Sequence, residues 1–133
     1  MVTRDLIDNI TAIMTRPDLE GQPAEVRGDI VARAEDERAE LAGQLRLERD
    51  EGGEDPLLAV VERARDRMLA AERDLRLLLA YAREFAEPRP YRLEDLARAA
   101  GMSISGIRTA YDDDQIGEVT AITGLVPRRR TAP

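Results

Sequence analysis

Apolar residues recur every three or four positions along residues 57–85, the longest regular pattern in the chain. Alternating steps of four and three residues connect its members, which are Leu57, Val61, Ala64, Met68, Ala71, Leu75, Leu78, Ala82 and Phe85. Such an a/d repeat is typical of the seam of a coiled coil or a helical bundle. It predicts one helix of about 30 residues, or roughly 45 Å at 1.5 Å per residue. A second apolar group widens this seam and predicts more than one partner helix: Leu58, Leu69, Leu77 and Leu79.

Two further amphipathic helices are predicted before the long one. Residues 3–14 form the first, with Thr3 as N-cap and an apolar side made of Leu6, Ile10 and Ile13, flanked by Ile7 and Met14. Residues 24–50 form the second, whose apolar stripe is Val26, Ile30, Ala34, Leu41 and Leu45, with Val31 and Ala42 beside it. We expect this second helix to fold back on the long one as an antiparallel hairpin of matched length. A second subunit is the other expected partner, and a purely intrachain bundle is the alternative.

Residues 92–112 predict two short helices joined by a tight turn. The first helix has an apolar face with i, i+3, i+4, i+7 spacing: Leu93, Leu96, Ala97 and Ala100. Gly101 tolerates the positive φ that a helix C-cap needs, and Ser103 can N-cap the second helix. Met102, Ile107 and Ala110 continue the apolar face. We expect residues 75–86 of the long helix to cover the inner side of both short helices.

The spacing of Ala97, Gly101 and Ile107, with the apolar set around it, resembles the helix-turn-helix of phage repressors and TetR-type regulators. In this motif the small residue lets the helices cross closely, the glycine makes the turn, and the isoleucine fills the gap between the helices. The resemblance implies that the second helix enters the major groove of DNA while the first lies across the backbone. The predicted second helix contains only one arginine, which is a departure from many such motifs. An ordinary helical corner is the alternative.

The resemblance implies two sets of DNA contacts. The residues expected to face base edges are Ser103, Ile104, Ser105, Arg108 and Thr109. Among them, Arg108 is the candidate for a bidentate guanine contact and Ile104 for a thymine methyl contact. The residues expected on phosphates are Arg89, Tyr91, Arg92 and Arg98. The basic tail with Arg128, Arg129 and Arg130 is a further candidate for phosphate contact; contact with a neighbouring acidic surface and a solvated terminus are the alternatives.

Charge is distributed unevenly along the 133 residues, whose formal net charge is −7. Residues 1–55 carry fifteen acidic residues and seven arginines, a net charge of −8, whereas residues 87–133 carry seven of each. A neutral C-terminal part predicts modest, salt-sensitive DNA affinity for a single copy. We therefore expect a homodimer whose seam includes Leu57, Val61, Ala64, Met68, Ala71, Leu75 and Leu78, with half-sites ~10 bp or a multiple apart.

Missing residue types narrow the possible chemistry. The chain has no cysteine, no histidine and no lysine, since all twenty basic residues are arginine. Disulfides, imidazole bases and lysine nucleophiles are therefore excluded, and we expect neither an enzyme nor a cofactor or metal site. Asp112, Asp113 and Asp114 are expected to cap a last helix over residues 114–123 rather than to bind calcium. Neither a membrane span nor a signal peptide is predicted, which favours a cytoplasmic protein, and arginine without lysine suggests a GC-rich bacterial genome.

These patterns predict an all-α fold. Residues 1–86 form a helical assembly region with a hairpin or coiled-coil-like bundle, residues 75–124 form a helix-turn-helix domain that shares the end of the long helix, and residues 125–133 form a basic tail. The predicted function is a dimeric, sequence-specific regulator of transcription that binds double-stranded DNA. The alternative is a helical protein-interaction module, adaptor-like or antitoxin-like, whose acidic N-terminal half engages a partner protein.

Overall fold

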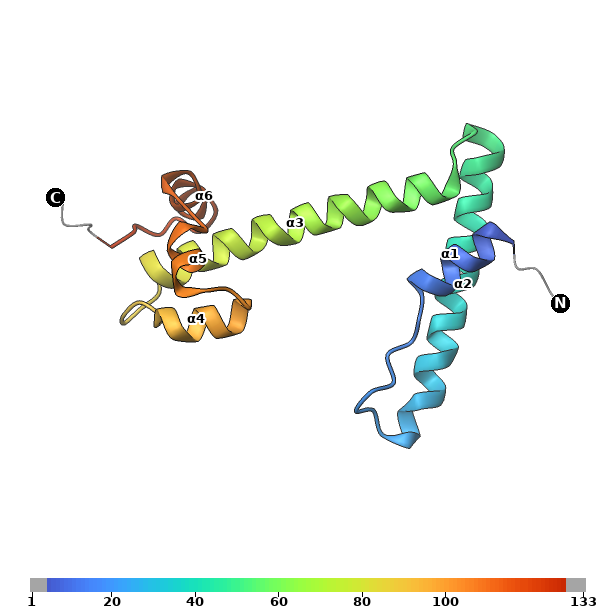
Figure 1. Ribbon diagram of the computed structural model, residues 1–133, viewed down its shortest axis with the longest axis horizontal. Coiled ribbons are helices and arrows are strands. Elements are labelled where there is room, and N and C mark those ends of the chain that lie inside the picture. Colours follow the sequence, from blue (N-terminus) through green and yellow to red (C-terminus); the bar gives the residue numbers. More distant parts are fainter. Residues whose placement is uncertain (1–4, 129–133) are drawn as a thin grey trace. The chain divides into compact units, whose positions relative to one another are not determined.

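The structure, a computed structural model, describes residues 5–128 and is helical throughout, which confirms the all-α prediction (Figure 1). The described residues form α1 (Leu6–Met14), α2 (Ala24–Gly52), α3 (Pro56–Glu84), α4 (Leu93–Ala100), α5 (Ile104–Thr109) and α6 (Asp113–Thr123). The chain divides into two compact units, residues 1–65 and 66–133, and the long helix α3 contributes residues to both. No helix among the described residues is long and apolar enough to cross a membrane.

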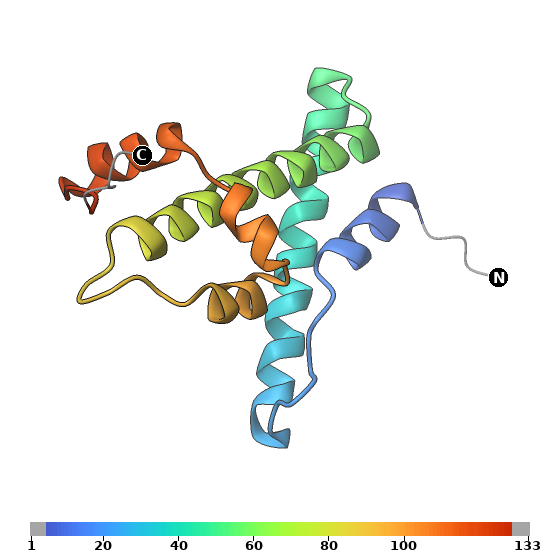
Figure 2. The same cartoon turned by 60° about the vertical axis from the view of Figure 1, so that its left-hand side comes forward.

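In the N-terminal unit, α1 lies beside α2 (Figure 2), and a small core joins them. Its buried members are Ile7, Ile10, Ala42, Leu45 and Val60. The predicted inner side of α1 was partly wrong, because Leu6 and Ile13 are 46% and 68% exposed while Thr11 is fully buried. Burial of Thr11 is tolerated because its hydroxyl donates a hydrogen bond to the Asp8 carbonyl at 3.1 Å. The helix therefore turns its Ile7–Ile10–Thr11 edge inward.

Within the N-terminal unit, α2 packs mainly against α1. The inner side of α2 is occupied by α1, and Arg46 of α2 pairs with Asp8 and Asp5 at 3.1 and 3.8 Å. Within the N-terminal unit, α3 buries only its first turns, through Ala59 and Val60. One ion pair, from Arg63 Nη2 to Glu48 at 2.7 Å, adds a polar contact between α2 and α3. The residues in the middle of α3 are exposed.

The C-terminal unit is built around the last three turns of α3. One cluster joins buried Leu79 to Ile107 and Ala110, and partly buried residues of α3, α4 and the turn surround it: Leu75, Leu93, Leu96, Ala97, Ala100 and Met102. A second cluster joins Ala80 and Phe85 to Ile116 and Val119 of α6. Tyr111 packs against both clusters. The expectation that the end of the long helix covers the two short helices is confirmed.

The last helix is fixed at its start by a capping box. Asp112 Oδ1 accepts from the Asp114 amide at 2.9 Å, and Gln115 Oε1 accepts from the Asp112 amide at 2.9 Å. These bonds satisfy amides that a helix N-terminus leaves without partners. The capping role predicted for the aspartate run is thus confirmed for Asp112. Ile116 and Val119 of this helix are buried, whereas Ile122 near its end is 69% exposed.

Candidate nucleic-acid interface

Gly101 makes the turn between α4 and α5. Its φ is 65°, in the left-handed region, and the Met102 amide donates to the Ala97 carbonyl at 3.0 Å to close the turn. A Cβ added at Gly101 would meet no atom within 4 Å. The backbone conformation, rather than lack of space, is therefore what requires glycine here.

Ser103 caps the start of α5. Its Oγ accepts a hydrogen bond from the Gly106 amide at 2.9 Å, as predicted for this N-cap. No role was predicted for Gly106. A Cβ at this position would lie 3.1 Å from Ser103 Oγ and 3.3 Å from Met102 Cε. A side chain at this position would therefore require Ser103 Oγ and the end of the Met102 side chain to shift by a few tenths of an ångström.

The inner side of α5 is locked by packing. Ile107 is fully buried and Ala110 is 8% exposed, and both contact Leu79 of α3. Arg76 of α3 secures the end of the helix, because its Nη1 donates to the Ala110 carbonyl at 3.2 Å while its Nη2 pairs with Glu72 at 2.7 Å. Nothing in the sequence separates Arg76 from the other arginines of α3, so this supporting contact was not predicted.

The outer side of α5 carries all five residues predicted to face DNA bases. Each of them is exposed: Ser103, Ile104, Ser105, Arg108 and Thr109. The Thr109 hydroxyl donates to the Ser105 and Gly106 carbonyls at 3.2 and 3.3 Å, so its oxygen remains available as an acceptor. The surface therefore offers hydroxyls, one guanidinium and one aliphatic side chain, which are the groups that read base edges in a major groove.

Four of the residues predicted to contact phosphates are exposed, three of them just before α4 and one in its last turn. They are Arg89, Tyr91, Arg92 and Arg98. Arg92 lies 3.3 Å from Glu94 in an ion pair whose arginine side chain is 75% exposed. The Tyr91 carbonyl accepts from Arg83 Nη1 at 2.7 Å, which ties this segment to the end of α3.

The prediction for Arg128 as part of a free basic tail needs correction. Its amide donates to the Glu84 carbonyl at 2.8 Å, and its Nη1 donates to the Arg83 carbonyl at 3.1 Å. These are carbonyls of the last turn of α3, which no helical amide can reach. Arg128 therefore serves to cap α3, and we remove it from the phosphate-contact set. Arg129 and Arg130 lie outside the described residues.

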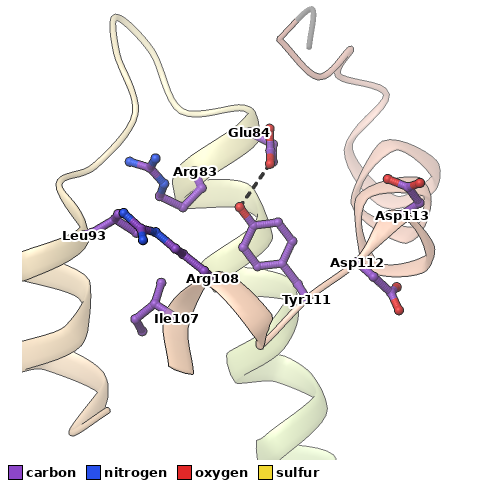
Figure 3. A pocket seen from close by; sticks show the side chains of 8 residues that line it. All are labelled: Arg83, Glu84, Leu93, Ile107, Arg108, Tyr111, Asp112 and Asp113. Carbon is purple, nitrogen blue, oxygen red and sulfur yellow. Dashed lines mark hydrogen bonds between the residues drawn. The ribbon is translucent and has the colours of Figure 1, made fainter. Parts of the chain in front are cut away.

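A hollow next to Arg108 is lined by arginines on one side and by aspartates on the other (Figure 3). Its walls come from Arg83, Glu84, Leu93, Ile107, Arg108, Tyr111, Asp112 and Asp113. The Tyr111 hydroxyl donates to Glu84 Oε1 at 3.0 Å and crosses the middle of the hollow. In Figure 3, Arg83 and Arg108 lie toward Leu93, whereas Asp112 and Asp113 lie beyond Tyr111. The positive side of the hollow thus adjoins α5 and the start of α4.

No cluster of acidic side chains that could hold a metal ion occurs in the part of the chain that the structure describes. Comparison with protein-family models, with curated proteins and with solved structures gives no match. The assignment of a function therefore depends on the geometry of α4, the turn and α5.

Proposed function

We propose that the chain is a sequence-specific, double-stranded-DNA-binding regulator of transcription that acts as a homodimer in the bacterial cytoplasm. The observation that carries this proposal is the division of α5 into two faces. Ile107 and Ala110 fix one face to α3, while Ile104, Ser105, Arg108 and Thr109 are exposed on the rest of the helix, next to the exposed N-cap Ser103. A helix held this way can enter a major groove without losing its supporting contacts.

Each group on the outer face has a role in the proposal. Arg108 donates two hydrogen bonds to a guanine, and Ile104 contacts a thymine methyl. Arg92, Arg98, Arg89 and Tyr91 hold phosphates on either side and set the register of α5. The proposal needs two copies, because the 66–133 unit carries eleven acidic residues and eleven arginines and so brings little net attraction to DNA.

A protein-interaction module is the second candidate, favoured by the charge of the N-terminal unit. Residues 1–65 contain sixteen acidic residues and nine arginines, a net charge of −7. Most of the acidic side chains of α2 are exposed, including Glu35, Asp36, Glu37 and Glu40. A basic protein is the partner that this surface fits. An antitoxin-like protein would use both units, one for a protein and one for an operator.

The test is to select binding sequences from a random DNA pool and measure affinities for the selected and a scrambled site. Arg108→Ala is expected to reduce discrimination between the two sites by about 1–3 kcal/mol. Arg92→Ala is expected to weaken both sites alike and to lower the slope of log K against log salt by about 1. Arg73→Ala, on an exposed position of α3, is the control and should change neither quantity.

Two results would reject the proposal. One is unchanged sequence preference in Arg108→Ala, which would remove α5 as the reading element. The other is failure of the wild-type protein to enrich any DNA, while a basic protein partner binds it tightly, which would favour the protein-interaction module.

A further inference from the structure

The middle of α3 leaves a seam of apolar side chains open to solvent. Val61, Met68 and Leu78 are 56%, 62% and 64% exposed, and Ala64 and Ala71 are exposed between them. Leu75 is half-buried, because it packs against the α4–α5 cluster of its own chain. Charged residues occupy most of the remaining surface of this helix segment. Burying such a continuous stripe removes apolar surface from water, which favours association.

We propose that this seam binds the same seam of a second copy in the antiparallel direction, with the two-fold axis between Leu69 and Ala70. This inference rests on the proposed function, because it states how the DNA-binding homodimer is assembled. In this register, the numbers of two seam residues that face each other add up to 139. Val61 faces the second copy's Leu78, Ala64 faces its Leu75, and Met68 faces its Ala71.

Side-chain size favours the antiparallel direction. In that direction every alanine of the seam faces a larger residue, either leucine or methionine, so that each layer is filled to a similar extent. In a parallel pair the same residues would face themselves, giving two alanine layers separated by a layer of two methionines. Alanine layers leave unfilled space unless the helices approach, and the methionine layer prevents that approach.

Charge complementarity gives the same direction. Positions that flank the seam meet residues of the second copy two positions out of level, so that Arg65 lies near its Glu72 and Arg67 lies near its Asp74. Symmetry then provides four pairs of opposite charge. All four residues are exposed. Glu72 uses Oε1 for its bonds from Arg76, which leaves its second carboxylate oxygen for Arg65 of the other copy. In a parallel pair only Arg67 and Glu72 would meet, and Arg65 and Asp74 would find no opposite charge.

The antiparallel direction also sets the distance between two reading units. Leu79, which contacts Ile107 of α5, lies nine to ten residues beyond the two-fold axis. At 1.5 Å per residue, the two copies of Leu79 are roughly 28 Å apart along the paired helices. This separation approaches the ~34–36 Å between half-sites one turn of DNA apart. A parallel pair would instead bring the two α3 ends within about 10 Å of each other.

Disulfide trapping tests the direction directly, since the chain has no cysteine. The variants Val61→Cys and Leu78→Cys are oxidised alone and as an equal mixture, without DNA, and the products are identified by mass. Both positions are exposed, so the substitutions leave the fold of each chain intact. Arg73→Cys, on the outer side of α3, is the control that measures random collision.

The expected result is a disulfide-linked dimer of Val61→Cys with Leu78→Cys in the mixture, well above the control, and little product from either variant alone. In the antiparallel pair, two copies of residue 61 are roughly 25 Å apart, too far for a disulfide. Strong linkage of each variant with itself would overturn the direction, and linkage no greater than the control would overturn the second copy as the occupant. Both results are independent of DNA binding, so they are distinct from a failure of the proposed function.

A charge reversal gives a second readout. Asp74→Arg faces Arg67 of the other copy in the antiparallel pair and is expected to weaken dimerisation roughly tenfold. Adding Arg67→Asp restores opposite charges and should recover most of the loss. Unchanged dimerisation in Asp74→Arg, measured by sedimentation, would contradict the antiparallel register, because a parallel pair places no charge opposite residue 74.

Discussion

The two units of this chain obtain order from different sources. In the C-terminal unit, α4 and α5 have eight and six residues, too short to be stable alone, yet both have defined ends. A left-handed glycine, a serine cap and the buried Ile107 provide that definition. In the N-terminal unit, α2 has 29 residues but only three buried ones, Ala34, Ala42 and Leu45. The short helices α4 and α5 are therefore stabilised by packing and caps rather than by their length.

The difference extends to what each unit leaves exposed. Around α5, the exposed groups are mainly polar and suit hydrogen bonding. In the N-terminal unit, several large apolar side chains are exposed beside many carboxylates: Leu6, Ile13, Leu47, Leu57, Leu58 and Val61. The C-terminal unit also exposes large apolar side chains, among them Met68 and Leu78 of the α3 seam. Under the proposed function, α5 of the C-terminal unit reads the ligand, whereas association uses the exposed seam of α3, which both units share. Three predictions test how the two units differ.

The largest effect is expected at Ile107. Ile107→Ala leaves a cavity among Leu79, Ala110 and the residues around them, and should cost about 2–5 kcal/mol of unfolding free energy. Ile104→Ala, three positions earlier and 38% exposed, is the matched control and should change stability by about 0.5 kcal/mol or less. Chemical denaturation measures both. Equal losses at the two positions would mean that α5 is not divided into an inner and an outer face.

A smaller effect, opposite in sign between the units, is expected for glycine-to-alanine changes. Gly101→Ala forces a Cβ into the left-handed region and should destabilise by about 1–2 kcal/mol. Gly43→Ala lies inside α2 with open space around it and should stabilise by about 0.5–1 kcal/mol. Thermal unfolding of the two variants checks the signs. A stabilising Gly101→Ala would show that the turn does not adopt the left-handed conformation.

The smallest effect concerns pH and the N-terminal unit. Hydrogen bonds from Arg63 lower the pKa of Glu48 below its usual value of 4.5. The carboxylate therefore contributes stability above that usual pKa, and the contribution is lost as the pH falls through the lower, folded-state pKa. Denaturation of wild type and Glu48→Gln from pH 7 downward should show a small difference that disappears in acid. A difference that grows as the pH falls would contradict the sign.

The sequence pattern predicted the C-terminal unit well because each signal there is local. Gly101, Ser103 and Ile107 act within one or two turns of the chain, and the structure confirms their turn, cap and core positions. Exposure of the five predicted base-contact residues follows from the same helical spacing. Whether those residues bind DNA is a question that spacing alone does not address.

The N-terminal unit was predicted less well because periodicity identifies a helix face but not what covers it. The seam of α3 predicted a hairpin with α2, whereas within the N-terminal unit the helix that packs along α2 is α1. Thr11 was overlooked because its hydroxyl bonds to the backbone and so can be buried. Arg128 resembled a free cation, yet it caps α3 from a distant part of the sequence. Contacts over such sequence distances have no local signal.

Guanine-N7 methylation interference on the selected DNA site tests whether α5 enters the major groove, because N7 lies in that groove. We predict that methylation of one guanine in each half-site blocks binding of the wild-type protein. We also predict that Arg108→Ala, assayed at higher concentration, loses this sensitivity while Arg92→Ala retains it. Wild-type binding that is indifferent to N7 methylation at every guanine of the site would contradict the assignment of α5 and Arg108 to the major groove.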